Sequence, residues 1–333
     1  MAAVAATYNR TVAATPIAIE LDGQYRAMRE ECGLLDRSER AKLLVEGGEG
    51  AEFLQGQLTN DIEALGPGTG CYAALLDRKG RMQADLRVLR LSPSSIWLDT
   101  EALAGEALRR HLELYRVGRE VELRDASDEK GILSVIGPQA AVLAEGAPRG
   151  TEHTHAKLEL GGIECRAVVT DVGIDLIVAA AEAEALGAAL IDAGAEPVSL
   201  AAAEILRVES GRPRFGAEMT NATIPEEAGI NDRAVSLTKG CYIGQETVAR
   251  LHYKGKPNRH LRGLRLDSEA AAGAVIRLGD RDVGELGSAV LSPALGRIGL
   301  AILRREATPG DEVLVDQDGR AEVVELPFTE EAT

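Results

Sequence analysis

The end of the chain reads as a series of short strands separated by glycine turns, and this feature limits the fold more than any other. Six such stretches lie between residues 261 and 328, namely LRGLRL, AVIRLG, RDVGELGSAV, RIGLAIL, DEVLVD and AEVVEL. Short strands at this spacing are typical of a small antiparallel barrel or sandwich. The stretch KGKPNRH before them is polar and contains glycine and proline, so we expect a domain boundary there.

Helices and strands alternate without a regular order in the longer region before that boundary. Residues from Pro16 to about Arg40 have helical spacing, and SLAAAEILRVESGRPRFG predicts a helix with Ser199 as N-cap and Gly211 at its end. The stretches CYAALLD and MQADLRVLRL flank RKGR, which predicts a β-hairpin. The pattern indicates an α+β region with mixed sheets and not a series of βαβ units.

Charge and composition exclude several classes of protein. The 333 residues include 53 Asp and Glu against 37 Lys and Arg, and the net charge of −16 repels nucleic acid and anionic membranes. No run of about 18 apolar residues is present, and the N-terminal stretch MAAVAATYNRTVAATP lacks the apolar segment of a signal peptide. We therefore expect a cytoplasmic protein that binds neither nucleic acid nor membrane directly.

The second strand of the predicted hairpin has one polar face. Side chains alternate along a strand, so Gln83, Asp85 and Arg87 share one face while the apolar residues between them share the other. The polar face is either exposed to solvent or forms the wall of a pocket in which Asp85 is an oriented carboxylate.

A second carboxylate, Glu209, falls in the last turn of a predicted helix, where the helix dipole disfavours negative charge. Two interpretations stay open. Either Arg207, Arg212 or Arg214 offsets the charge, or Glu209 is held there to accept hydrogen bonds from a ligand amine.

Two of the five histidines, His153 and His155, are spaced so that they would share one face of a strand. A metal site needs about three or four protein ligands, and no further ligand is evident. We therefore predict no metal site.

The stretch TKGCYIGQE places Cys241 in a glycine-flanked loop ahead of a helix that is expected to begin near Gln245. A helix N-terminus and a neighbouring lysine both stabilise a thiolate, so the helix and Lys239 are expected to lower the pKa of Cys241. The spacing alone leaves open whether this thiol is reactive or structural.

Three further cysteines lie far apart and form no CxxC pair. They are Cys32, Cys71 and Cys165. Their apolar or strand-like surroundings indicate buried, reduced thiols.

A basic segment follows the cysteine motif. Its cations are Arg250, Lys254, Lys256, Arg259 and Arg262. On so acidic a chain, the segment is either a solvated linker or a docking site for an anion at the mouth of a pocket.

KGCYIGQETVAR resembles the signature of the YgfZ-type folate-binding proteins, which are relatives of the glycine-cleavage T-protein, an aminomethyltransferase. Further segments are similar in the same order: FLQGQLTNDI, DRKGRMQADLRV, RVESGRPRFG with PEEAGI, and VGELGSAVLSPALGRIGLAILRRE. The similarity covers most of residues 30 to 328. Aminomethyltransferases of similar fold carry no matching cysteine, so the signature points to the YgfZ-type branch.

The resemblance implies a GcvT/YgfZ-like α+β fold, in which three subdomains form a ring around a tetrahydrofolate pocket and the last is an antiparallel β-barrel. The folate-binding region would span residues 1–255 as two interlocked subdomains, roughly 1–46 with 132–255, and 47–131. The barrel domain would span 256–333.

The resemblance also implies residue roles. Asp85 falls where the T-protein has the carboxylate beside the folate reaction centre, Tyr72 matches an aromatic residue of the same pocket, and Glu209 matches the acid that binds the pterin ring. A pterin presents an amino group and a ring N–H side by side, which suits a carboxylate. The chain departs from the T-protein, which usually has paired acids in place of Ala84 and Asp85 and an aromatic in place of Leu89. These departures weaken the case for aminomethyl transfer.

Three hypotheses follow from the resemblance and the residues. In the first, the protein binds tetrahydrofolate or a one-carbon derivative and assists iron–sulfur cluster assembly or repair, with indirect effects on tRNA modification. Its partners would be iron–sulfur client or assembly proteins, and Cys241 would be the reactive group. Because a cluster needs about four ligands, Cys241 would share any cluster with a partner protein. In the second, it is a folate-dependent aminomethyltransferase or other one-carbon transferase with Asp85 as acid–base or electrostatic group. In the third, it is an adaptor with folate as a structural ligand.

Overall fold

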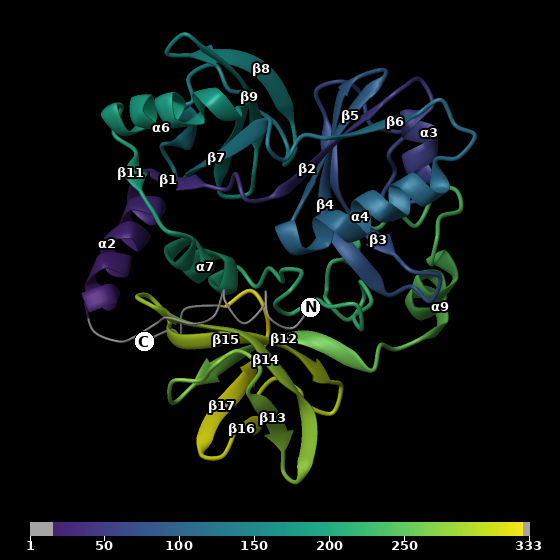
Figure 1. Ribbon diagram of the computed structural model, residues 1–333. Helices are drawn as coiled ribbons and strands as arrows, with labels where there is room; N and C mark the ends of the chain where they lie inside the picture. The colour runs from purple at the N-terminus through teal and green to yellow at the C-terminus, as the bar shows by residue number, and fades with distance from the viewer. Residues whose placement is uncertain (1–15, 329–333) are drawn as a thin grey trace.

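The computed structural model describes residues 16–328, which form three parts around a common middle (Figure 1). A six-stranded and a five-stranded sheet lie side by side, and a barrel lies across from both. Helix α7 (Leu200–Glu209) and the segment after it run between the parts. The α+β fold with a C-terminal antiparallel barrel, expected from the sequence, is confirmed. Residues 1–15, which make up most of the N-terminal stretch considered as a signal peptide, lie outside the described residues.

The six-stranded sheet has the order β11-β1-β7-β10-β9-β8. Its strands are β1 (Gly33–Asp36), β7 (Lys130–Ile136), β8 (His155–Leu160), β9 (Ile163–Val169), β10 (Gly173–Ala179) and β11 (Glu196–Pro197). Its helical segments are α2 (Pro16–Glu30), α5 (Ala140–Leu143), η1 (Ala180–Glu182) and α6 (Ala183–Asp192). The expected helix from Pro16 to Arg40 is wrong in its second half. Glycine at position 33 disfavours helix, and β1 is too short for its own periodicity to show in the sequence.

The five-stranded sheet has the order β3-β4-β5-β2-β6. Its strands are β2 (Ala41–Glu46), β3 (Gly70–Leu76), β4 (Met82–Ser92), β5 (Ser95–Thr100) and β6 (Glu122–Asp125), with helices α3 (Gly50–Gln55) and α4 (Ala102–Tyr115). The predicted β3–β4 hairpin is confirmed, and Gly80 adopts φ +76° in its turn. Strand β2 pairs with β5 on one side and with β6 on the other, so residues 41–46 belong to this sheet.

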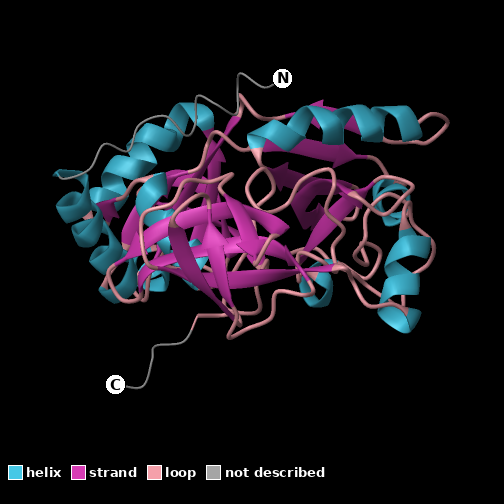
Figure 2. Cartoon of the chain, turned by 90° about the horizontal axis from the view of Figure 1, so that it is seen from below, coloured by secondary structure: helices cyan, strands magenta, loops and turns pink. Residues whose placement is uncertain are grey.

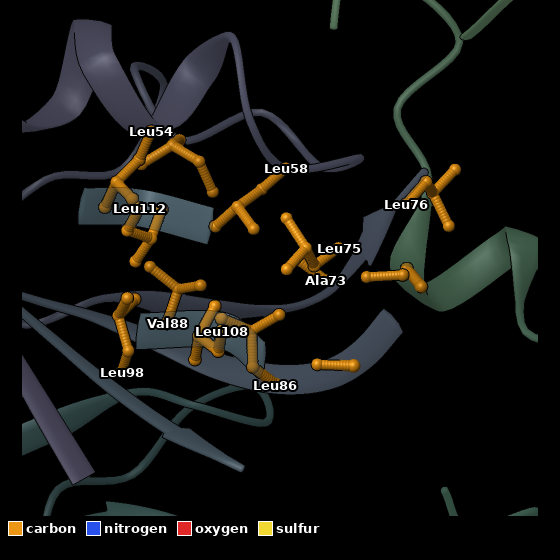
Figure 3. Close-up of a cluster of buried hydrophobic side chains, with 14 of the residues drawn as sticks. Leu54, Leu58, Ala73, Leu75, Leu76, Leu86, Val88, Leu98, Leu108 and Leu112 are labelled. Carbon is orange, nitrogen blue, oxygen red and sulfur yellow. The ribbon is translucent and has the colours of Figure 1, made fainter. Parts of the chain in front are cut away.

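Leucines of α3, β3, β4, β5 and α4, together with Leu58 after α3, close the core of the second subdomain (Figure 3). Leu54 and Leu58 face the apolar side of the hairpin, and Leu108 and Leu112 of α4 pack against it. Each fully buried leucine stabilises the fold by roughly 1.5–3 kcal/mol. The apolar face of β4 therefore points into this core, and the face that carries Asp85 points the other way.

The barrel closes in the order β12-β15-β14-β13-β16-β17, which leaves no open sheet edge. Its strands are β12 (Arg259–Leu266), β13 (Val275–Leu278), β14 (Arg281–Ser292), β15 (Gly296–Arg304), β16 (Glu312–Val315) and β17 (Gly319–Val324). Seen from below, its strands cross one another in front of the body, and most helices lie toward the outside (Figure 2). Leu264, Ile276 and Leu303 belong to its apolar core.

Two connecting helices complete the described chain: α8 (Asn231–Ala234) and α9 (Gln245–Lys254). Ser199 is the N-cap of α7, as predicted, because its side chain accepts a hydrogen bond from the Ala202 N–H. Within residues 16–328, no helix combines the length and the apolar character needed to cross a membrane.

Candidate functional site

Tyr72 and Asp85 meet on one face of the β3–β4 hairpin. The Tyr72 hydroxyl donates a 2.8 Å hydrogen bond to Asp85 Oδ2, whereas Asp85 Oδ1 is buried and has no partner in the described part of the chain. Burial raises the pKa of Asp85; the Tyr72 hydrogen bond opposes the shift and the charge of Glu101 adds to it. The structure thus brings two predicted site residues together around one unsatisfied carboxylate oxygen.

The rest of this hairpin face is not exposed to solvent, so the solvated alternative is wrong. Arg87 and Leu89 are buried. Arg87 Nε donates to Asp99 Oδ2 at 2.7 Å, and its Nη1 donates to Asp175 Oδ2 at 2.6 Å. Since Asp175 belongs to β10 of the six-stranded sheet, the face is pressed against the first subdomain by buried ion pairs.

Arg233, on α8, covers Tyr72. Its guanidinium carbon lies 5.0 Å from the Tyr72 ring centroid, and its Nη2 donates to Glu152 at 2.9 Å. The Asn60 side-chain amide donates to the main-chain carbonyls of both Tyr72 and Arg233, which fixes the pair. Sequence reasoning missed Arg233, because a one-turn helix carries no periodicity and its contact with β3 arises only in the fold.

Glu209 is the last residue of α7 and lies where three parts of the chain meet. It accepts hydrogen bonds from Ser292 of β14 at 2.5 Å and from the Tyr25 hydroxyl of α2 at 3.3 Å. Burial raises the pKa of Tyr25 to about 12, and the neighbouring carboxylate adds to the shift. Two neutral hydroxyls therefore hold this carboxylate, and each of its oxygens keeps room to accept a further donor.

The arginine interpretation of Glu209 is wrong. Arg207 pairs with Glu204 and Glu218, Arg212 pairs with Glu152 and Asp171, and Arg214 pairs with Glu204 and Glu101. All three arginines are thus committed to other acids. The carboxylate of Glu209 accepts hydrogen bonds from hydroxyl groups instead.

A cavity of about 760 Å³ lies beside Glu209. Its wall includes Glu209, Asp171, Arg29 and Arg149, together with apolar residues of the first subdomain, α7 and the barrel. This volume falls in the range of small-molecule and cofactor sites. Tyr72, Asp85 and Cys241 are not part of its wall, so the structure does not bring all the predicted site residues into one cavity.

A chain of contacts nevertheless joins this cavity to Asp85. Arg212 Nη1 lies 3.0 Å from Asp171 and 3.1 Å from Glu152, and Glu152 binds Arg233, which covers Tyr72. Burial raises the pKa of Asp171, and Arg212 opposes the shift. The cavity wall and the Tyr72–Asp85 pair are therefore two ends of one polar network.

Cys241 is exposed in the loop between α8 and α9, and α9 begins at Gln245 as predicted. The expected role of Lys239 is wrong. Lys239 is buried, and its Nζ donates 2.7 Å hydrogen bonds to the carbonyls of Gln55, Leu58 and Asn60. Burial lowers the pKa of Lys239 to about 8. The amine is thus a clamp between the loop and the end of α3, and not a counter-ion of the thiol.

The other three cysteines are free thiols, as predicted. Cys32 and Cys165 are buried, and burial raises the pKa of each to about 11. Cys71 is half-buried, and desolvation raises its pKa to about 12. Thiols with pKa values this high carry little thiolate at neutral pH.

The basic segment does not line the cavity, contrary to the expectation that it lies at a pocket mouth. Arg259 pairs with Glu227, and Arg262 pairs with Glu325. The cations of the cavity wall are instead Arg29 and Arg149, which lie far from this segment in the sequence.

His153 and His155 do not share a strand face. His155 begins β8, and its Nδ1 lies 2.8 Å from Arg166 Nη1, whereas His153 lies in the preceding turn with φ +72°. No group of His, Cys, Asp and Glu suited to a metal ion occurs among residues 16–328.

Residues 4–239 match the family described as the GCVT N-terminal domain, and residues 259–330 match the glycine cleavage T-protein C-terminal barrel domain. A relative named aminomethyltransferase from Rubrobacter xylanophilus is 29% identical over 92% of this chain and 86% of its own length. Another from Mycolicibacterium paratuberculosis is 32% identical over 92% of this chain and 88% of its own. The crystal structure of the glycine cleavage system aminomethyltransferase T from Bartonella henselae superposes with a TM-score of 0.83, at 26% identity, over 93% of this chain and 90% of that one.

Proposed function

This chain belongs to the glycine cleavage T-protein family, and from this membership we propose that it is a tetrahydrofolate-dependent one-carbon transferase similar to the aminomethyltransferases. The family uses tetrahydrofolate. The observation that carries the proposal concerns the two oxygens of Asp85. Tyr72 donates a hydrogen bond to Oδ2, whereas the buried Oδ1 has no hydrogen-bond partner among residues 16–328. Perturbed, partly unsatisfied carboxyl groups of this kind are typical of acid–base or electrostatic roles.

The residues present fit the cofactor. Glu209 keeps acceptor capacity on both carboxylate oxygens and lies on a cavity of about 760 Å³, so it would hold a ring that presents two adjacent N–H donors. Asp85 and Tyr72 would face the one-carbon unit. When bound, tetrahydrofolate supplies a nucleophilic amine for the one-carbon group.

Asp85 is the residue of this chain that acts on the reacting atoms. Oδ1 would take up a proton from the amine or stabilise the positive charge that develops there, and the raised pKa of Asp85 suits a group that holds a proton. Tyr72 orients the Asp85 carboxylate through a hydrogen bond to Oδ2. Arg233 lies over the Tyr72 ring and restricts the movement of that ring. The ion pairs of Arg87 keep water from this face of the hairpin.

The departure at Ala84 does not argue against transfer. Ala84 is fully buried in the apolar cluster behind the sheet, and adjacent residues of a strand point to opposite faces. An acid at this position would not reach the face that carries Asp85.

The test is Asp85→Asn, an exchange of nearly equal volume. We expect the rate of methylene-tetrahydrofolate formation from an aminomethyl donor to fall by about 10²–10⁴, the usual contribution of a general acid or base. Folate affinity, measured by calorimetry, should change by less than about threefold. A wild-type protein that forms no methylene-tetrahydrofolate, or a variant as fast as wild type, would contradict the proposal.

A second proposed function is the iron–sulfur role, with Cys241 as reactive thiol and iron–sulfur client or assembly proteins as partners. The exposure of Cys241 and the KGCYIGQE signature favour it. The three other thiols have raised pKa values, so an alkylating reagent at pH 7 should modify Cys241 first. Cys241→Ser should keep folate affinity and fail to complement an iron–sulfur enzyme defect. Full complementation would leave the transferase as the sole function.

A further inference from the structure

Buried polar atoms without partners gather where the turn at His153 meets the β3–β4 hairpin. Both ring nitrogens of His153 are buried and make no hydrogen bond to the described residues, and the same is true of Nη2 of Arg87. Asp85 Oδ1, on the same hairpin face as Arg87, is a fourth such atom. Native proteins satisfy all but a few per cent of such atoms, and use water or ligand atoms where the protein itself does not. Four such atoms on three residues indicate a binding point.

The position of His153 is closely determined. Its backbone has φ +72°, which is uncommon for a residue with a β-carbon, and its N–H donates a 2.8 Å hydrogen bond to the Val169 carbonyl. A β-carbon on Gly70 would lie 3.1 Å from the His153 Cβ, so the histidine packs directly on the start of β3. The side chain is 12% exposed, and its Nε2 lies 3.8 Å from Glu152 Oε1. The charges of Glu152, Arg87, Asp99 and Arg233 all act on its ring, the carboxylates against the two cations.

The chemistry of this point follows from which atoms remain free. Desolvation lowers the pKa of His153 to about 4, so at neutral pH the ring offers one N–H donor and one acceptor nitrogen. Arg87 has Nε on Asp99 and Nη1 on Asp175, which leaves Nη2 as a second donor. Two donors of this kind complement an acceptor oxygen.

We propose that His153 and Arg87 form a further binding point of the site, which takes a carbonyl or carboxylate oxygen of a bound molecule. Val169 and Gly150, which flank this turn, also belong to the wall of the Glu209 cavity, so the point lies directly behind that wall. The inference rests on the proposed function for its place in the site. The oxygen belongs either to folate or to a separate small carboxylate.

The experiment is ¹⁵N NMR of histidine-labelled full-length protein, with the His153 ring signals assigned by comparison with His153→Asn. The protein is titrated with tetrahydrofolate and, in a separate sample, with formate. We expect the His153 ring nitrogens to shift in one of the two titrations, which identifies the source of the oxygen. The His111 signals, from a ring that bonds Gln57, should stay in place. If neither probe moves His153, the proposal is overturned.

Variants separate binding from folding. His153→Asn keeps a donor and an acceptor and tolerates positive φ, whereas His153→Gly removes the ring and relieves the backbone. We expect about a tenfold loss of affinity for the active probe in His153→Gly, which corresponds to about 1.4 kcal/mol, and less than a threefold loss in His153→Asn. Equal affinities in all three proteins overturn the proposal. Calorimetry with tetrahydrofolate on the same samples tests the proposed function separately, because the formate titration decides the inference even if folate does not bind.

Discussion

Glu209 and Asp85 are two carboxylates of one network, and the chain holds them in opposite ways. Glu209 accepts hydrogen bonds from two neutral hydroxyls that come from α2 and the barrel, and it lies on a cavity. Asp85 accepts one hydrogen bond from Tyr72, and its buried Oδ1 has no hydrogen-bond partner in the described part of the chain. It lies on a hairpin face that Arg87 ties to the first subdomain through charged pairs.

The difference assigns different tasks to the two ends. A carboxylate held by neutral hydroxyls keeps its acceptor strength for ligand donors, which suits binding. A carboxyl with a raised pKa and a free oxygen is prepared for a change of charge, which suits chemistry. Variants at the two ends should therefore affect different quantities: stability and pH dependence at the Asp85 end, and affinity at the Glu209 end.

The largest effect is expected for Asp99→Asn, which breaks the charged support of the Asp85 end. Asp99 accepts hydrogen bonds from Arg40, Arg87 and Trp97. Burial alone would raise the pKa of Asp99, but the two arginines outweigh this effect and hold the pKa well below its usual range. Removing the charge leaves the buried guanidinium of Arg87 and the half-buried guanidinium of Arg40 short of a partner, so the free energy of unfolding should fall by about 3 kcal/mol. Denaturant titration measures the change.

The matched control is Asp282→Asn, because Asp282 pairs with Arg277 at an exposed site of the barrel. Its free energy of unfolding should change by less than about 0.5 kcal/mol. If Asp99→Asn unfolds at the same denaturant concentration as wild type, the ion pairs are not what supports this end of the network.

The sequence predicted the parts of the fold that depend on local chemistry. The β3–β4 hairpin follows from a glycine turn between alternating strands, the N-cap of α7 follows from Ser199, and the barrel follows from short strands at even spacing. The start of β1 was missed, because four residues are too few to show a period of two.

The site was predictable only as separate residues. A resemblance named Tyr72, Asp85 and Glu209, but their environment depends on contacts between distant segments. Arg233 on Tyr72 and Ser292 on Glu209 each join residues that lie more than eighty positions apart. Lys239 shows the opposite error, since closeness in sequence suggested a partner for Cys241 while the fold directs its amine to three carbonyls of another segment.

The next effect concerns the Glu209 end. Glu209→Ala removes the acceptor for two donors of the ligand. Because a hydrogen bond to a charged group contributes about 1.5–3 kcal/mol, we expect the affinity for tetrahydrofolate to fall by about 2 kcal/mol, or roughly 30-fold. Calorimetry measures this loss. Glu204→Ala, on the same helix but outside the cavity wall, should bind like wild type. Equal affinity of Glu209→Ala and wild type would remove Glu209 from the site.

The smallest effect, Tyr72→Phe, sharpens the comparison most, because it changes one hydrogen bond at the Asp85 end. That bond lowers the pKa of Asp85 against the raising effect of burial, so its loss raises the pKa further. If the ionised carboxylate is the active form, activity falls as Asp85 becomes protonated on lowering the pH. In Tyr72→Phe this loss should begin at a higher pH than in wild type. The net free energy of the bond is about 1 kcal/mol, and a pH profile of the transfer rate measures the displacement.

Tyr25→Phe is the counterpart at the other end, since it removes one hydroxyl from Glu209 and leaves Asp85 untouched. Here the affinity for tetrahydrofolate should change while the pH profile stays in place, because no group near Asp85 is altered. The two phenylalanine variants differ from wild type by one oxygen each, so differences in volume do not explain contrasting results. A pH profile that moves with Tyr25→Phe, or one that stays fixed with Tyr72→Phe, would show that the two carboxylates do not divide binding and chemistry between them.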